Sequence, residues 1–149
     1  MALIAYDSLE TAQRMLDQSY EFAAKRQDYH TVHIDMQQSR LLLKLSAIEQ
    51  KPNESYKLFK NAMGFLNKVP DDFQKFRLVD EISRVFNSRF NGFSTGHKNS
   101  FLSMSEKLLK GLNNFLKSGK EQESKILRLN STRVNLEEII AEGKRQVLT

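Results

Sequence analysis

Cysteine and tryptophan are absent from this chain of 149 residues, and proline occurs only twice. Without cysteine, the chain can form neither a disulfide nor a thiolate metal site, and it has no thiol nucleophile. Six glycines and two prolines are too few turn residues for an all-β fold of many short strands. No apolar run approaches the roughly 20 residues that a membrane-spanning helix needs. The composition therefore predicts a soluble helical chain.

The first 51 residues contain neither glycine nor proline. Because these two residues interrupt helical backbone most strongly, the stretch from Met1 to Lys51 favours helix throughout. Hydrophobic residues make up 40% of the chain, which is enough at this length for a core without disulfides or metal. We therefore expect a single all-α domain, an antiparallel helical bundle of five or six helices.

Apolar residues recur at helical spacing in six stretches. The expected helices span residues 8–27, 30–50, 54–68, 72–90, 100–117 and 120–147. The first has one apolar face, whereas Ile34–Ile48 has two, which is typical of a helix packed between neighbours. We expect Ile34–Ile48 to be the central helix of the bundle. A bend near Asp28–Thr31 would separate it from the first helix, although one long helix from 8 to 50 stays open.

Capping residues indicate where several of these helices begin. Asp7, Asp71 and Ser118 each stand three residues before a Glu or Gln, which is the spacing of a capping box. Asn53 can cap the third helix, because its side chain can accept a hydrogen bond from the first turn. Asn91–Asn99 contains two glycines among polar residues and is expected to be a loop, with the next helix beginning near residue 100.

Five phenylalanines interleave with basic residues in the expected fourth helix and the segment after it. They are Phe73, Phe76, Phe86, Phe90 and Phe93. Rings and cations together suit single-stranded nucleic acid, because bases stack on rings while phosphates meet cations. The last three rings, however, share one helical face with Val79 and Ile82. We therefore expect these rings in the core, with Arg77 and Arg84 on the solvent side.

The net charge of +5 belongs to the last two thirds of the chain. Residues 1–51 carry a net charge of −1, whereas 52–98 and 99–149 each carry +3. Residues 97–120 form a cationic amphipathic helix that could dock in an acidic-rimmed groove or lie on an anionic membrane. Its lysines could equally border an ordinary buried stripe. The candidate binding lysines are Lys107, Lys110, Lys117 and Lys120.

The last expected helix, residues 120–147, is polar outside a narrow apolar stripe. This composition is typical of a coiled-coil strand, so the helix could pair with a second copy or with another protein. The stripe residues that would make such a contact are Ile126, Leu129, Leu136 and Ile140. We predict an oligomer or a stable complex that depends on this helix.

His30 and His33 are the candidate metal ligands, because they lie one helical turn apart. A metal would still need ligands from another helix, and no Glu-x-x-His pair of the di-iron type occurs in the sequence. Nor does any spacing of serine, histidine and acid mark a catalytic site, although such sites assemble in space. We therefore predict no cofactor and no catalytic residue, and a polar hinge or solvated face at these histidines.

These observations favour a non-enzymatic protein–protein interaction module, such as an adaptor, a secretion-type chaperone or an assembly subunit. One alternative is a nucleic-acid-associated protein that uses the basic residues 73–120. A second is a small helical enzyme or metal carrier that uses His30 and His33. The first residues lack the basic start and long apolar core of a signal peptide, which favours the cytoplasm, or a host cell for a delivered effector.

Overall fold

The computed structural model describes residues 2–25, 32–119 and 121–148, with side chains of the first helix from residue 9 to 22. Within these ranges the chain forms helices and no strand. The elements are α1 (Ala2–Lys25), α2 (Val32–Ile48), α3 (Pro52–Leu66), α4 (Phe73–Phe76), α5 (Val79–Arg89), the 3-10 helix η1 (Phe90–Gly92), α6 (Thr95–Lys117) and α7 (Glu123–Leu148). Six α-helices have 11 residues or more. The prediction of an all-α bundle of five or six helices is confirmed.

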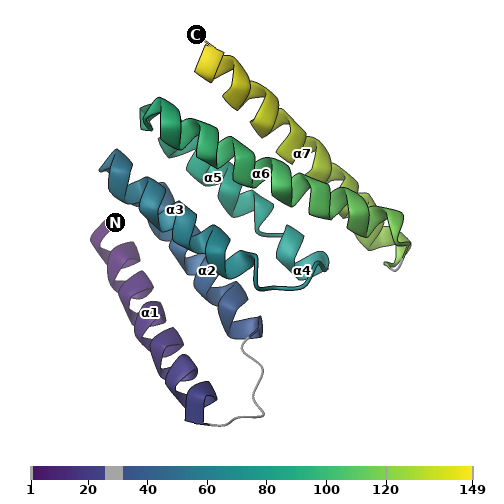
Figure 1. The fold of residues 1–149 in the computed structure, drawn as a ribbon. Coiled ribbons are helices and arrows are strands. Elements are labelled where there is room, and N and C mark those ends of the chain that lie inside the picture. The colour runs from purple at the N-terminus through teal and green to yellow at the C-terminus, as the bar shows by residue number, and fades with distance from the viewer. Residues whose placement is uncertain (1, 26–31, 120, 149) are drawn as a thin grey trace.

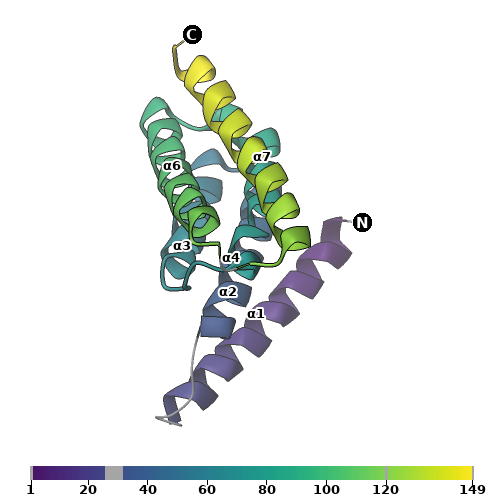
Figure 2. The same cartoon turned by 90° about the vertical axis from the view of Figure 1, so that its right-hand side faces the viewer.

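The helices alternate in direction along the chain, as Figure 1 shows. Two pairs of consecutive helices, α2 with α3 and α6 with α7, pack side by side. The shorter α5 packs against both α2 and α7 and so joins the two pairs. At one edge, α1 packs against α2 and is inclined to the other helices (Figure 2). α2 therefore contacts α1, α3 and α5, which confirms the prediction of a central helix.

The core is built from phenylalanine and aliphatic side chains of α2 to α7. Phe101 lies at its centre, with its ring stacked on Phe59 at 4.3 Å between centroids and edge-on to Phe90 at 5.2 Å. Phe86, Phe90 and Phe93 are buried beside Val79 and Ile82, whereas Arg77 and Arg84 are exposed, so the prediction for this stripe is confirmed. Phe73 and Phe76 are also buried, so none of the five rings offers a stacking platform on the surface.

A small residue allows α6 and α7 to approach closely. Gly143 is buried in α7, and a Cβ at this position would overlap the Leu102 side chain and lie 3.3 Å from the Phe90 ring. Any larger side chain would have to displace these neighbours, because packed interiors leave little free volume. The gap in the apolar stripe of this helix is therefore part of the packing.

The starts of α1, α3 and α4 differ from the predictions. α1 begins at Ala2, so Asp7 lies inside the helix and is not its cap. α3 begins at Pro52, because proline suits the first helical position, where its missing N–H would have no partner in any case. The prediction of Asn53 as cap was therefore wrong. For α4, the capping side chain is Asp72, which accepts a hydrogen bond of 2.8 Å from the Lys75 amide.

The predicted loop Asn91–Asn99 is mostly helical. Only Phe93 and Ser94 lie between η1 and α6. The Ser94 side chain caps α6 by accepting a hydrogen bond from the His97 amide at 3.2 Å, which lets the helix begin at Thr95. The cap and the packing of this helix outweigh the cost of Gly96 in its first turn, about 1 kcal/mol. Ser118 closes α6 and does not open α7, because Gly119 follows with φ +65° and ends the helix.

Candidate functional site

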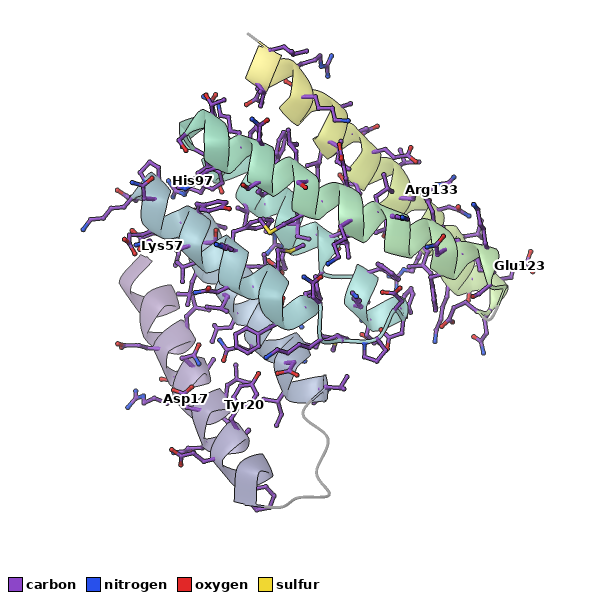
Figure 3. The ribbon with its side chains drawn as sticks, in the orientation of Figure 1. Asp17, Tyr20, Lys57, His97, Glu123 and Arg133 are labelled. Carbon is purple, nitrogen blue, oxygen red and sulfur yellow. The ribbon has the colours of Figure 1, made fainter. Side chains whose placement is uncertain are left out.

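The contact between α1 and α2 contains two polar pairs. The side-chain amides of Gln13 and Gln38 donate to each other, with both N–O distances at 2.8 Å. Two turns further along α1, the hydroxyl of Tyr20, whose side chain is labelled in Figure 3, donates to the Asp35 carboxylate at 2.8 Å. Gln38 and Asp35 are only 4% and 5% exposed, so α1 supplies hydrogen-bond partners to polar side chains that lie within its contact with α2. These pairs fix how α1 sits on α2.

The Tyr20 phenol is perturbed by this environment. Burial raises its pKa first, and the hydrogen bond to Asp35 together with the charge of that carboxylate raises it further. All of these causes disfavour the phenolate, which would have to lose water and face a negative neighbour. The phenol therefore stays protonated and acts as a hydrogen-bond donor, and it is not poised as a base.

A groove of about 390 Å³ runs along the other side of the same helix pair. We call it the α1–α2 groove, and its lining residues are Leu9, Ala12, Met15, Leu16, Gln37, Arg40, Leu41 and Lys44. Its wall from α1 is entirely apolar, and Met15 is 64% exposed there. The only ionisable groups in the lining are Arg40 and Lys44, both from α2. The groove is thus an apolar trough with a basic edge.

A second, polar pocket of about 220 Å³ adjoins the groove and shares Gln37 and Arg40 with it. It lies where α2, α4 and α5 meet, and it adds the guanidinium groups of Arg77 and Arg84. The acids beside them are Asp80 and Glu81. Glu81 forms ion pairs with Arg84 at 3.4 Å and with Lys44 at 3.8 Å. The basic edge therefore continues away from the groove.

A third cleft, of about 610 Å³, lies on the opposite side of α1, between α1, α2 and α3. The Tyr20 ring reaches across it to Phe65 of α3, with 6.2 Å between the ring centroids. Lys60 of α3, Lys68 in the turn after α3 and Asp17 of α1 also line it. With the groove on one side and this cleft on the other, α1 borders open space on both sides of its contact with α2.

The predicted binding lysines lie on α6, away from this region. Lys107, Lys110 and Lys117 are exposed, and Lys120 lies outside the described residues. The opposite face of α6 is buried through Leu108 and Leu112. In this arrangement the lysines border a stripe that the chain itself covers.

The predicted contact stripe of α7 lies within the chain's own core. Leu129, Leu136 and Ile140 are buried, and Ile126 is half-buried. These side chains pack into the core because α5 and α6 lie against α7, so a partner could reach them only by opening the bundle. The exposed apolar residues of α7 are instead Leu127, Val134 and Leu148. They form a line one residue wide with polar neighbours, which lacks the paired seam of a coiled coil.

The candidate metal ligands cannot be compared as a pair. His33 is exposed near the start of α2, whereas His30 lies outside the described residues. Among the residues that the structure describes, no group of three or more histidine, aspartate or glutamate side chains could hold a metal ion.

Lys75 is the one buried lysine among the described side chains, at 7% exposure. Its Nζ donates to the Val69 carbonyl at 3.0 Å and to the Asp71 carboxylate at 2.9 Å. The ammonium group is thus paired with a charge and with the backbone, which is the usual way a protein keeps a charge inside. Lys75 ties the segment after α3 to α4 and is accounted for as a structural residue.

Sequence patterns did not indicate the α1–α2 groove. The apolar face of α1 was visible as Leu9, Ala12 and Leu16, but periodicity cannot say whether such a face is covered. The Gln13–Gln38 and Tyr20–Asp35 pairs join residues 25 and 15 positions apart, and polar residues carry no periodic signal. Sequence also cannot show that Arg40 lies beside Arg84, because that depends on how α5 packs on α2.

In the described parts of the chain, no helix is long and apolar enough to cross a membrane. We compared the chain with protein-family models, with curated proteins and with solved structures, and none of the three comparisons gives a match. The site must therefore be interpreted from its own chemistry.

Proposed function

We propose that this protein is a non-enzymatic interaction module that binds a helix of another protein in the α1–α2 groove. The observation that carries the proposal is the apolar wall of α1, where Met15 is 64% exposed beside Leu16 and Leu41. An amphipathic helix is the usual ligand of such a trough, because its apolar side chains at positions i, i+3, i+4 and i+7 can fill it.

The charge along the groove indicates which helix would bind. Arg40 and Lys44 stand at the edge, and Arg77 and Arg84 continue the basic surface beyond it. Against these four cations stand Asp80 and the paired Glu81. A helix with an apolar face and an acidic flank would therefore be complementary, and a basic flank would be repelled.

The lining also argues against catalysis in this groove. General acid–base or nucleophilic catalysis needs a group such as a histidine, a carboxylate, a serine or a free lysine amine near the reacting atoms, whereas Lys44 is ion-paired with Glu81 at 3.8 Å. The α1–α2 groove offers apolar side chains, one amide, one guanidinium and one ammonium group. These groups can hold and orient a partner, and we assign no reaction to them.

The test uses two designed helical peptides of about 18 residues, long enough to form a stable helix when bound. Both carry the same leucine face, and one has glutamate and the other lysine on its flanks. Fluorescence anisotropy at low salt would measure the affinity of each. We expect the acidic peptide to bind at least about tenfold more tightly, a difference of about 1.4 kcal/mol. Equal affinities, or binding of neither peptide, would contradict the proposal.

Matched variants locate the binding site. Met15→Asp places a charge in the groove, whereas Leu127→Asp places one at an apolar position of α7 with almost the same exposure, 66% against 64%. Arg40→Glu removes a cation from the edge, and Lys107→Glu makes the same change on α6. We expect Met15→Asp and Arg40→Glu to weaken binding of the acidic peptide and the two α7 and α6 variants to leave it unchanged. Circular dichroism would confirm that all four variants are folded.

A further inference from the structure

Among its described side chains, from residue 9 to 22, α1 contributes no residue to the hydrophobic core cluster of the bundle. The core cluster and the half-buried residues packed on it come from α2 to α7 and the segments between them. In α1, none of the side chains described, from residue 9 to 22, is buried. The covered surface lies on the other side of the contact, on α2, where Ile34, Asp35, Gln38 and Leu41 are buried. We call this surface of α2 the seat of α1. In the described part of the chain, the core cluster is therefore formed by residues from α2 to α7 and the segments between them.

The seat of α1 on α2 nevertheless specifies its occupant. Asp35 accepts a hydroxyl donor, Gln38 pairs with an amide, and Leu41 meets apolar residues. α1 supplies these groups in register through Tyr20, Gln13 and Leu16. Matching groups at fixed spacing make the seat a selective helix-binding site, because a mismatched helix would leave the polar groups of α2 unpaired.

If α1 left the seat, water could hydrate the polar groups of α2 that α1 covers. The amide of Gln38 and the carboxylate of Asp35 can both be hydrated once exposed, so opening does not strand them as it would inside an apolar core. Open space already borders α1 on both flanks, through the groove of about 390 Å³ and the cleft of about 610 Å³. These features set α1 apart from the helices that share the core.

We infer that α1 is an exchangeable arm, and that the seat on α2 also accepts α1 from a second copy of this chain. A second copy carries the same Gln13, Leu16 and Tyr20, so it makes the same contacts as the chain's own helix. Exchange of an identical element is a route to a dimer that requires no new interface. In the exchanged dimer each α1–α2 groove is rebuilt from two chains, so the inference does not depend on what binds in that groove.

The chain contains no cysteine, so introduced cysteines are its only thiols. Gln13→Cys and Gln38→Cys would be purified as separate proteins, mixed and incubated over a range of concentrations. They would then be treated with a short bismaleimide cross-linker, because two glutamines that meet through their amides are too far apart at Cα to rely on a direct disulfide. In an exchanged dimer, the cysteine at position 13 of one copy lies beside the cysteine at position 38 of the other. We expect a cross-linked dimer whose yield rises with concentration, measured on a denaturing gel. The control mixture pairs Gln38→Cys with Leu127→Cys, whose exposed position on α7 reports random collisions.

A double variant with Gln13→Cys and Gln38→Cys in one chain shows whether the two positions are adjacent. Closure within single chains at low concentration, with the mixture no more cross-linked than the control at any concentration, would overturn the exchange. Failure of the double variant to cross-link within its own chain would overturn it too, since positions 13 and 38 would then not be neighbours. A second pair, Ala12→Cys and Leu41→Cys, repeats the test through the apolar contacts in case loss of the amide pair unseats α1.

Discussion

The two longest helices of this protein, α1 and α7, use their apolar residues in opposite ways. α7 has 26 residues and buries Leu129, Leu136 and Ile140 in the core. α1 has 24 residues, and none of its side chains from residue 9 to 22 is buried. α7 packs on α5 and α6, whereas α1 packs on α2 alone apart from minor contacts. An apolar stripe on a long helix is thus no measure of how firmly that helix belongs to the fold.

This difference reverses the roles that the sequence indicates. The polar composition of the last helix predicts that it pairs with a partner as in a coiled coil. The single apolar face of the first helix predicts that it packs on the core. In the structure, the stripe of α7 is covered by the chain itself. α1 presents Met15 to solvent and sits on polar pairs. The surface we propose for binding therefore lies at the opposite end of the chain from the predicted one.

The largest expected effect is a cavity in α7. Leu136→Ala should lower the free energy of unfolding by about 2–5 kcal/mol, because the site is fully buried and packed on all sides. Leu16→Ala in α1 removes the same atoms at a half-buried site and should cost clearly less. Urea denaturation followed by circular dichroism measures both. Equal losses would show that α1 is as firmly packed as α7.

A second prediction concerns the gap in the stripe of α7. Gly143→Val should destabilise the protein by about 1–3 kcal/mol, because the added carbons would press on Leu102 and Phe90. Ala141→Val, at an exposed position of the same helix, is the control and should change stability by less than about 0.5 kcal/mol. A stable Gly143→Val variant would mean that α6 and α7 do not approach as closely as described.

The third prediction is a dependence on pH that belongs to the α1 contact. The pKa of Tyr20 is raised above its ordinary value of 10.0, so above that pH the unfolded chain releases the phenolic proton while the folded chain retains it. The contribution of this group to stability is therefore present below pH 10 and is lost as the pH rises further. Thermal melts between pH 8 and 11 should show a steeper loss for the wild type than for Tyr20→Phe. Parallel curves would contradict the buried hydrogen bond.

The smallest effect is expected from Tyr20→Phe itself near neutral pH. The variant keeps the ring but leaves the Asp35 carboxylate without the phenol, a loss of about 1–3 kcal/mol if the carboxylate stayed buried. Because α1 can move away and let water reach Asp35, we expect about 1 kcal/mol or less in global stability. A comparable loss from Gln13→Ala would fit the same view, since Gln38 can be hydrated in the same way.

Sequence periodicity was sufficient for the fold class and for part of the core. The two apolar faces of Ile34–Ile48 predicted the central helix, and the shared face of Phe86, Phe90 and Phe93 predicted their burial. Caps are predicted less well: local spacing does not indicate Asp72 or Ser94, and it indicates Asn53 as a cap although α3 begins at Pro52 without a side-chain cap. Serine and aspartate occur too often for local spacing to single out the one that meets a free amide.

The candidate site could not be predicted, because it depends on which helix covers which. Whether Leu9, Ala12 and Leu16 face a core or a groove depends on how close α5 and α3 come to α1, and no local pattern records that. The polar pairs of α1 with α2 are likewise long-range contacts between residues without periodicity. Such contacts follow only from the three-dimensional arrangement.

Hydrogen exchange of backbone amides in the unmodified protein tests most directly whether α1 is separable from the bundle. Amides of α1 should exchange through a local opening of lower free energy than the global unfolding that exposes α3, α5 and α7. Mass spectrometry of peptides covering residues 9–22 and 129–143 gives the comparison. We expect the α1 peptide to exchange at least about tenfold faster, corresponding to about 1.4 kcal/mol. Equal protection of both peptides, unchanged by denaturant well below the unfolding transition, would contradict a separable α1.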